Sequence, residues 1–570
     1  MWTTQSRHRA AGVLMAIAVL LTLPLASAVQ YQRDFYSSIA DLLDLVEQEE
    51  EVSLILLEYA ERLKTLHSNI ISFVETRQPY HDLETDSEVA DYMKHPVHAF
   101  HLMKRMVVDL GSIESQINEL HASDPRPDIT EMRASRLLPW EDDFNGIALS
   151  LARLQDTYLL NMTNLVDGHL AITSGPRNHT VPGRISLTGE PAADEGDDLH
   201  KNLRKIRQTS PRDCIFMGQV AVHNGFYDRS VEWVERALEK AANENPPSIS
   251  TGHFAKYLDL LIKKHDNVLN SVGKAGLEWQ TYGVPVRERN KKRLQFRTKL
   301  FTENLTIAQE DQNYKRLCRG EQLRTPKMDS QLRCRYFYGE GGFFRLQPVK
   351  IEEANLKPYI ITFHDIIGER DINDLIEFAT PRLSRSTHFA DDGIETSLIR
   401  TSSTAWLGDE DAPVATRLNR FLESLLGVGA RYLKGEAEHY QIANYGVGGQ
   451  FAAHIDYLDD ILADPNRTID DFGRTSGDRI ATLMFYLSDV EEGGATVFPN
   501  LGVRLKPKKG NAAFWWNLNA DGEGEKLTKH GGCPVLYGSK WIANKWFRSN
   551  SNMFRLPCPR NRSQPMAPLV

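Results

Sequence analysis

The chain lacks an excess of basic residues, and this limits its partners. Its 67 Lys and Arg residues are outnumbered by 76 Asp and Glu residues, which gives a formal net charge of −9. A protein whose main ligand is nucleic acid needs cations to neutralise phosphates. The charge balance therefore argues against nucleic acid as a partner.

Beyond the N-terminus the sequence also lacks an apolar run of the roughly 20 residues that cross a bilayer. The apolar run that is present, Ala10 to Leu25, follows Arg7 and Arg9 and is followed by Ala26-Ser27-Ala28. A basic start, a short apolar run and a small-residue end are typical of a cleaved signal peptide. We therefore predict a signal peptide over residues 1–28, entry into the secretory pathway and no membrane span.

Cysteine is scarce, and an odd number of cysteines leaves at least one without an intrachain partner. Disulfides are permitted in a secretory chain. The clustering favours the pairs Cys318–Cys334 and Cys533–Cys558, with Cys214 left over. The same route would permit glycosylation at five sequons, at Asn161, Asn178, Asn304, Asn466 and Asn561.

At 570 residues the chain is too long for one core, so several domains are expected. Residues 29–175 are predicted to be helical. Their apolar residues alternate between spacings of four and three, which is the pattern of a short coiled coil. This seam either joins two chains or packs inside one chain, and it consists of Val52, Leu56, Tyr59, Leu63, Leu66, Ile70 and Phe73.

The rest of the chain divides by composition. Residues 176–205 are rich in Pro, Gly and acidic residues and are predicted to be a linker. Small and aromatic residues over 206–285 follow the pattern of a tetratricopeptide-like helical hairpin. A basic, turn-rich linker with a cysteine pair is expected over 286–345, and a tail over 559–570. Short β-rich runs fill 346–558, which predicts an all-β sandwich or barrel, such as a jelly roll.

The β-rich region contains a candidate metal site. His454 and Asp456 are two residues apart, so on a strand they point to the same face. His530 lies close to another predicted strand and completes the set. Two His and one carboxylate on one face of a metal are the ligands of non-heme Fe(II) oxygenases. Lys540 follows in a mostly apolar strand, where an ammonium group is costly unless it meets a carboxylate.

The residues around this site resemble the α subunit of collagen prolyl 4-hydroxylase. The resemblance is specific in the β-rich region and weakest in the middle of the chain. In the catalytic region it rests on Gln441 to Gln450, His454-Ile455-Asp456, Gly493 to Pro499 and His530 to Trp546. Elsewhere it rests on His95 to Phe100, Arg153 to Tyr158, Leu317 to Glu321 and Cys334 to Tyr336.

The resemblance implies a multidomain chain with an α-helical N-terminal dimerisation domain, a tetratricopeptide-like peptide-binding domain and a C-terminal double-stranded β-helix catalytic domain. It implies Fe(II) on His454, Asp456 and His530, with ascorbate to restore oxidised iron. It also implies 2-oxoglutarate as co-substrate, held by Lys540, Tyr445 and Thr496. Substrate-side roles are expected for Arg479 and Trp546, and peptide-binding roles for Tyr227 and Tyr257. From its residue type alone, Arg479 could instead form a structural ion pair.

Two segments depart from the pattern of this family. Phe451-Ala452-Ala453 stands where members often carry Tyr-Glu-Pro, so the aromatic ring is kept but its hydroxyl is lost. Leu258 to Lys263 stands where the peptide-binding domain has further tyrosines. Both departures concern the peptide, and neither concerns the metal ligands.

The function that the resemblance implies is a procollagen-proline 4-dioxygenase α subunit of the endoplasmic reticulum lumen. It would hydroxylate proline at C4 in X-Pro-Gly sequences, using O2 and 2-oxoglutarate, and release succinate and CO2. It would form an α2β2 tetramer with protein disulfide isomerase. The alternatives are the same chemistry on another proline-rich secreted protein, and a non-catalytic paralogue that binds proline-rich chains.

Overall fold

The structure is a computed structural model of the whole chain. It describes residues 37–76, 105–122, 124–135, 138–139, 141–167, 209–271, 280–290, 298–338, 342–390, 393–396, 400–458 and 471–556, with residues 81, 85 and 566. The predicted signal peptide, the 176–205 linker, most of the predicted tail and Cys558 lie outside these residues. In the described part, no helix is both long and apolar enough to span a membrane.

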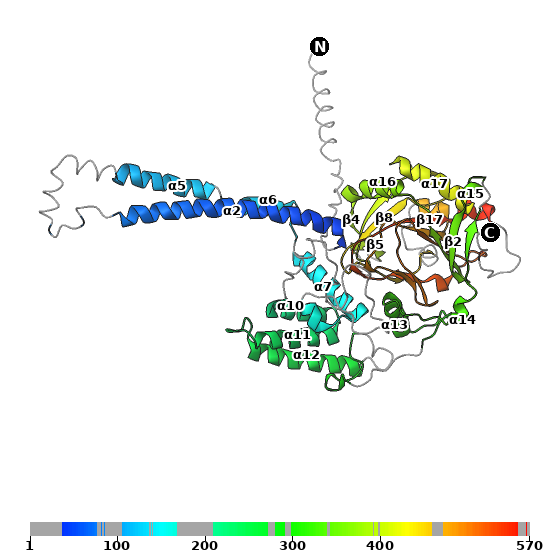
Figure 1. The fold of residues 1–570 in the computed structure, drawn as a ribbon, viewed down its shortest axis with the longest axis horizontal. Coiled ribbons are helices and arrows are strands. Elements are labelled where there is room, and N and C mark those ends of the chain that lie inside the picture. The colour runs from blue at the N-terminus through cyan, green and yellow to red at the C-terminus, as the bar shows by residue number, and fades with distance from the viewer. Residues whose placement is uncertain are drawn as a thin grey trace, which may run out of the picture.

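Two facing β-sheets form the C-terminal half of the chain (Figure 1). The larger sheet has nine strands in the order β1-β2-β3-β14-β10-β17-β8-β7-β4. In chain order these strands are β1 (Cys334–Phe337), β2 (Val349–Leu356), β3 (Tyr359–His364), β4 (Ser384–Arg385), β7 (Ser403–Leu407), β8 (Tyr440–Tyr445), β10 (Arg479–Tyr486), β14 (Ala512–Trp516) and β17 (Lys540–Arg548).

The smaller sheet has the order β13-β12-β15-β9. Its strands are β9 (Phe451–His454), β12 (Thr496–Phe498), β13 (Val503–Leu505) and β15 (His530–Gly532). From β8 to β17 the chain passes back and forth between the two sheets, which is the strand order of a jelly roll. Two further antiparallel pairs join β11 (Glu492–Gly493) to β16 (Val535–Tyr537) and β5 (Thr387–Ala390) to β6 (Gly393–Thr396).

The central strands of the large sheet are buried on both faces and are mostly apolar, whereas β1 and β2 at its edge are partly exposed. Every residue of β8 and β14 is buried. Helices α16 (Glu369–Ala379) and α17 (Pro413–Leu426) cover the outer face and pack into its apolar core. The short helices of this half are α15 (Gly342–Leu346), α19 (Asp471–Ser476), α20 (Ser549–Asn552), η6 (Thr380–Arg382), η7 (Tyr432–Lys434), η8 (Lys526–Thr528) and η9 (Met553–Arg555).

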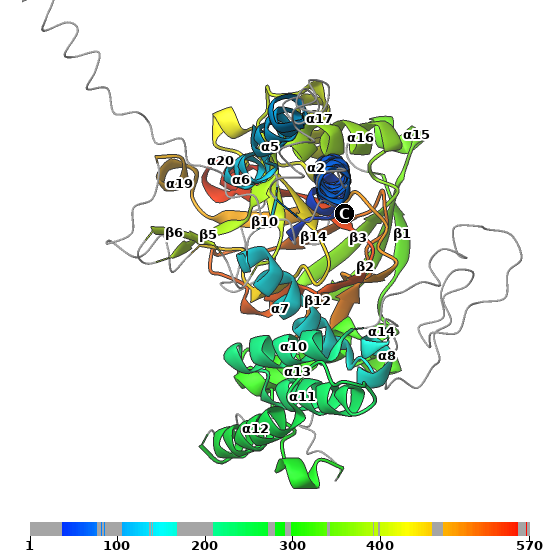
Figure 2. The same ribbon diagram turned by 90° about the vertical axis from the view of Figure 1, so that its left-hand side faces the viewer.

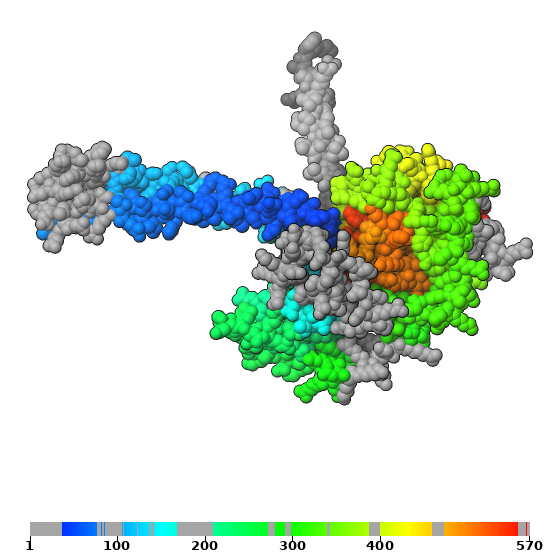
Figure 3. Space-filling view, viewed as in Figure 1, coloured from blue at the N-terminus to red at the C-terminus, as the bar shows by residue number. Residues whose placement is uncertain are grey.

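The N-terminal helices form an arm that projects from the body (Figures 1 and 3). They are α2 (Ile39–Glu75), η3 (Arg105–Asp109), α5 (Leu110–Ala122) and α6 (Arg126–Ala134). Asn69 on α2 donates to Gln116 on α5 at 2.6 Å, so part of α2 packs within the chain. In the predicted seam Leu66 is buried, whereas Leu56 and Leu63 are 46% and 43% exposed. Packing within the chain therefore covers only part of the seam.

Below the sheets lies a stack of helices (Figure 2). Its members are α7 (Glu141–Tyr158), α8 (Met162–Val166), α10 (Pro211–His223), α11 (Tyr227–Ala241), α12 (Thr251–Ser271) and η5 (Val286–Glu288). Gly218 lets α10 and α11 cross closely, because a Cβ there would lie 2.7 Å from Val234 Cγ2. The Ser230 hydroxyl on α11 donates to the Gly218 carbonyl at the same crossing.

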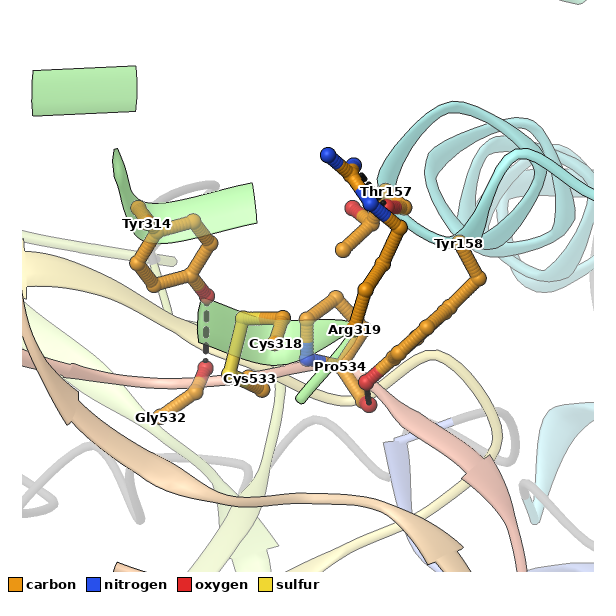
Figure 4. The surroundings of a disulfide bond; sticks show 8 residues. All are labelled: Thr157, Tyr158, Tyr314, Cys318, Arg319, Gly532, Cys533 and Pro534. Atoms are coloured by element: carbon orange, nitrogen blue, oxygen red, sulfur yellow. Dashed lines mark hydrogen bonds between the residues drawn. A yellow bond between two sulfur atoms is a disulfide. The ribbon is translucent and has the colours of Figure 1, made fainter. Parts of the chain in front are cut away.

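Between the helical stack and the sheets lie α13 (Ile307–Cys318) and α14 (Pro326–Asp329). The predicted disulfides Cys318–Cys334 and Cys533–Cys558 are wrong, because Cys318 is bonded to Cys533 (Figure 4). The end of α13 packs against the residues that follow β15, whereas Cys334 is an exposed free thiol on β1, at the edge of the large sheet. Cys214 is free, as predicted, and the structure shows that it is buried.

We predict that Cys318→Ser lowers stability whereas Cys334→Ser does not. The bond joins residues 215 positions apart, and removing such a crosslink typically costs about 2–5 kcal/mol, because the unfolded chain regains conformational freedom. Thermal unfolding of both variants measures the difference. Non-reducing peptide mapping should recover a peptide that links Cys318 to Cys533. Recovery of Cys318 linked to Cys334 would contradict the pairing described here.

Candidate active site

Two histidine rings meet on the inner face of the small sheet. Strands β9 and β15 are antiparallel neighbours, and His454 lies directly opposite His530 in their register. Their ring centroids are 4.4 Å apart. The Nδ1 atom of His454 bonds the Ala452 carbonyl at 2.8 Å, and that of His530 bonds the Thr528 carbonyl at 3.0 Å. Both Nε2 atoms are therefore left as acceptors.

Asp456 follows β9 and brings its carboxylate between these rings. Its Oδ1 lies 3.5 Å from His454 Nε2, and its Oδ2 lies 3.8 Å from His530 Nε2. The Oδ2 atom also accepts hydrogen bonds from the Thr482 hydroxyl at 2.7 Å and the Trp546 indole N–H at 3.1 Å. Those two donors are opposite each other on β10 and β17 of the large sheet. The carboxylate is thus held by both sheets.

The charge states in this cluster suit a cation. Burial raises the pKa of Asp456, but the two histidines and Arg479 outweigh it and hold the pKa well below the ordinary range of a carboxyl group. Burial lowers the pKa of His530 to about 4, and its ring packs against Trp515 at 4.6 Å and Phe498 at 5.5 Å between centroids. A carboxylate and a neutral imidazole are the protonation states of metal ligands.

The prediction that these three residues converge is confirmed. One ligand atom from each of His454, Asp456 and His530 lies within 4.8 Å of the others. The donor set is two imidazole nitrogens and one carboxylate. The Nδ1 atom of each histidine and the Oδ2 atom of Asp456 are hydrogen-bonded to other residues. This set fits a first-row divalent metal such as Fe(II) with open positions on one side.

Lys540 lies deeper between the sheets, where it is 3% exposed. Burial lowers the pKa of Lys540 to about 7, from an ordinary value of 10.5. Within the described chain no carboxylate forms an ion pair with it. A Cβ added at Gly532 would lie 3.7 Å from Lys540 Nζ, so a side chain there would fill the space beside the amine. The surroundings of Lys540 fit the carboxylate of a bound small molecule.

Tyr445 and Thr496, the other predicted co-substrate residues, lie near Lys540. Tyr445 is directly opposite Lys540 across strands β8 and β17, with its ring centroid 5.5 Å from Nζ. Thr496 is paired with Gly532 in the small sheet. Its hydroxyl accepts a hydrogen bond from Tyr486 at 3.0 Å, a residue that no pattern in the sequence marked.

Arg479 and Trp546 form one stack beside the metal ligands. The Arg479 guanidinium lies 4.0 Å from the Trp546 ring centroid. It is also paired with both oxygens of Glu438, at 2.6 and 2.9 Å. Sequence reasoning named the two stacked residues but missed Glu438, which reaches Arg479 from a segment 41 residues earlier. The ion pair still leaves the side chain of Arg479 20% exposed.

Phe451, at the departure from the family pattern, stacks on a metal ligand. Its ring centroid is 3.6 Å from that of His454, with 18° between the planes. The guanidinium of Arg400 lies 5.0 Å above Phe451 and 6.0 Å from the Tyr445 ring. Arg400 is buried and bonds Ser402 and Gln441. No sequence pattern had marked Arg400 as a residue of the site.

The predicted peptide residues of the helical stack lie on neighbouring helices. Tyr227 begins α11, and its ring centroid is 5.7 Å from Lys264 Nζ on α12. Tyr257 on α12 contacts Phe254 edge to face, with centroids 6.4 Å apart. In the divergent segment, Leu261 is buried whereas Leu260 is 61% exposed. In the described chain, no contact links Tyr227 or Tyr257 to the candidate metal ligands.

Two parts of the chain match known families. Residues 38–171 match the N-terminal region of the prolyl 4-hydroxylase α subunit. Residues 440–548 match the 2OG-Fe(II) oxygenase superfamily. The second match contains the three candidate ligands, together with Lys540, Tyr445 and Thr496.

Curated relatives match along nearly their whole length. Prolyl 4-hydroxylase subunit alpha-1 of Homo sapiens is 32% identical over 565 residues, which cover 96% of this chain and 98% of the relative. Prolyl 4-hydroxylase subunit alpha-2 of Gallus gallus is 31% identical over 558 residues, which cover 93% and 96%. Among solved structures, a viral collagen prolyl hydroxylase from Paramecium Bursaria Chlorella virus-1, in its 2OG complex, is 28% identical. That match covers 33% of this chain and 95% of the viral chain, with a TM-score of 0.25.

We predict that Thr482→Val weakens metal binding. The valine keeps the shape of the side chain but removes the donor to Asp456 Oδ2, and loss of such an outer partner typically costs about 10–100-fold in metal affinity. Calorimetric titration with Mn(II), as a stand-in for Fe(II), measures the change. Thr416→Val, at an exposed threonine of α17, is the control. Equal affinity in the two variants would show that the Thr482 hydrogen bond does not support the ligand.

Proposed function

The chain belongs to the prolyl 4-hydroxylase α-subunit family, and on this basis we propose that it is a procollagen-proline 4-dioxygenase α subunit. It hydroxylates proline at C4 in X-Pro-Gly sequences of collagen-like chains. The reaction consumes O2 and 2-oxoglutarate and yields succinate, CO2 and hydroxyproline, so that one oxygen atom enters succinate and the other enters the product.

One observation carries the proposal: a two-histidine, one-carboxylate cluster lies close to a buried lysine that has no carboxylate ion pair in the described chain, and the charge of this lysine acts on the pKa of His530. A metal site alone would fit many reactions. A buried amine beside it, with room at Gly532, fits a co-substrate that offers a distal carboxylate. The combination supports 2-oxoglutarate over a metal-bound water as the working partner of the site.

The residues of the site divide the work. His454, Asp456 and His530 would hold Fe(II), and bound iron with 2-oxoglutarate supplies the oxidative decarboxylation that activates O2. Lys540, Tyr445 and Thr496 orient the co-substrate, and the apolar rings around His530 exclude water. Trp546 holds Asp456 by its N–H, and Arg479 covers the Trp546 ring on the side proposed to face the peptide. Ascorbate would restore iron that is oxidised in idle turnovers.

The helical parts of the chain are proposed to bind the peptide substrate and the other subunits. The α10–α12 stack is proposed to be a tetratricopeptide-like module that binds extended proline-rich chains through Tyr227 and Tyr257. Leu56 and Leu63 on α2 remain partly exposed, which supports pairing of two α chains through the arm. Protein disulfide isomerase as the β subunit completes an α2β2 tetramer in the endoplasmic reticulum lumen.

A second candidate is the same chemistry on a different proline-rich secreted chain. The specific observation in its favour is Leu260, which is 61% exposed in the segment where the family has further tyrosines. Phe451, which keeps a ring beside His454 but offers no hydroxyl, is the second departure from the family pattern. Both changes alter peptide recognition and leave the metal ligands in place.

We expect peptide-dependent succinate release from the wild-type chain and none from His454→Ala. Loss of a ligand imidazole leaves two protein donors, too few to hold the iron. A (Pro-Pro-Gly) repeat and peptides from other proline-rich secreted proteins are the substrates, and hydroxyproline is mapped by mass spectrometry. Release with other peptides alone would favour the second candidate. Equal behaviour of wild type and His454→Ala with every peptide would refute catalysis.

We predict that affinity for 2-oxoglutarate falls as the pH rises above about 7. The pKa of Lys540 is lowered to about 7 in the free site, so above this pH the amine is neutral. Binding a carboxylate favours the charged form of Lys540, so a neutral Lys540 must take up a proton when 2-oxoglutarate binds. This proton uptake becomes less favourable as the pH rises. Calorimetry with Mn(II) across about pH 6.5–9 measures the slope.

The control for this dependence is Lys540→Arg, whose side chain stays charged throughout that range. We expect its affinity to be weaker overall but flat with pH. If both proteins lose affinity in parallel, another group is responsible for the titration.

A further inference from the structure

The N-terminal region contacts the catalytic region at a loop beside the candidate co-substrate residues. Gly446 to Gly449 joins Tyr445, at the end of β8, to the start of β9, which leads to His454. The loop therefore connects a residue of the co-substrate pocket with a metal ligand. Its position is partly set within the catalytic region, because Gly448 N–H donates to Val535 O and Val535 N–H donates to Gly449 O.

Helix α7 supplies a donor to this loop from outside. The Arg153 guanidinium donates to the Gly448 carbonyl at 3.0 Å and to the Thr401 hydroxyl at 3.2 Å. Thr401 N–H in turn donates to Gln450 O, just beyond the loop. The Nη1 atom of Arg153 thus links the Gly446–Gly449 loop to the segment that holds Thr401. Arginine suits this role because its guanidinium carries several N–H donors.

The backbone of α7 lies against the same loop. Gly448 has a φ of +66°, and a Cβ there would lie 2.7 Å from Ser150 Cβ and 3.0 Å from the Ser150 carbonyl oxygen. Only glycine accommodates both the backbone conformation and the approach of the helix. Ser150 and Arg153 are three residues apart and so share one face of α7.

The end of α7 contacts a second loop of the site (Figure 4). The Tyr158 hydroxyl donates to the Pro534 carbonyl at 2.6 Å. A Cβ at Gly493 would lie 2.8 Å from that hydroxyl oxygen. A Cβ at the next residue, Gly494, would lie 3.4 Å from Lys540 Cδ, so this contact also lies close to the candidate co-substrate residues.

The start of the arm adds two bonds to the co-substrate strand. Gly446 N–H donates to the Ser37 carbonyl at 3.0 Å. Ile39 N–H donates to the Asn444 side chain at 3.1 Å. The start of the arm thus holds the chain on both sides of Tyr445, and α7 holds the loop that follows.

We propose that α7 braces the co-substrate site and that Arg153 is a positioning residue for 2-oxoglutarate, acting through the Gly446–Gly449 loop. This inference rests on the proposed function. The hydrogen bonds described for Arg153 reach Gly448 and Thr401, neither of which is a candidate metal ligand. Arg153 holds the loop that sets the position of Tyr445, and so it acts on co-substrate affinity and leaves the metal ligands, which are paired across β9 and β15, in place.

The test compares Arg153→Met with Arg153→Lys and with Arg126→Met in the full mature chain. Arg126 is an exposed arginine paired with Asp124 on the arm and serves as the matched control. The affinity for 2-oxoglutarate in the presence of Mn(II) is measured by calorimetry. We expect Arg153→Met to bind about tenfold more weakly, the usual scale for losing a hydrogen bond from a charged donor. Arg153→Lys should bind at an intermediate strength, and Arg126→Met should equal wild type.

Two further readouts separate positioning from general loss of structure. Mn(II) affinity without 2-oxoglutarate should be unchanged, and hydrogen exchange should accelerate at the amides of Gly446 to Gln450 in Arg153→Met. Arg153→Lys carries the test if the methionine variant does not fold. Unchanged 2-oxoglutarate affinity, or an equal fall in metal affinity, would overturn the inference. If wild type itself fails to bind 2-oxoglutarate, the proposed function falls instead.

Discussion

The site depends on the Asp456 carboxylate, which joins the two sheets. Asp456 follows a strand of the small sheet, yet its Oδ2 accepts hydrogen bonds from Thr482 and Trp546 on the large sheet. A buried charge is tolerated only with such partners. The two histidine rings are already paired by the register of β9 and β15, so the large sheet holds the third ligand against them. Separating the sheets would remove both donors and leave the buried charge without them.

Local patterns predicted the centre of this site well, and non-local contacts account for what the sequence did not reveal. The two-residue spacing of His454 and Asp456, and a lysine in an apolar strand, follow from strand geometry and desolvation alone. Glu438 and Arg400 are defined only by what the fold brings beside them. The Cys318–Cys533 bond was missed for the same reason: clustering along the chain favoured near neighbours, whereas α13 docks on the residues after β15.

Phe451 keeps a structural role at a position where the hydroxyl of the family pattern is lost. Its ring stacks on His454 at 3.6 Å, so the aromatic body still orients a ligand imidazole. The hydroxyl that family members often carry at this position would extend beyond that stack. Losing it leaves the imidazole supported, because the stacked ring is kept. The candidate metal ligands are therefore intact at this departure from the family pattern.

The helical stack and the oxygenase region share one core, and α7 is the reason. While Arg153 and Tyr158 face the catalytic loops, Asp156 on the same helix lies 2.8 Å from Lys315 on α13 and 3.8 Å from Arg229 on α11. Burial raises the pKa of Asp156, but these cations outweigh it and keep the carboxylate charged. Withdrawing α11 or α13 would remove one of the two cations that face this buried carboxylate, and breaking a buried pair costs far more than breaking an exposed one. Helix α7 therefore contacts the helical stack and the loops after β8 and β15 at once, so it fixes the position of the stack relative to the candidate active site.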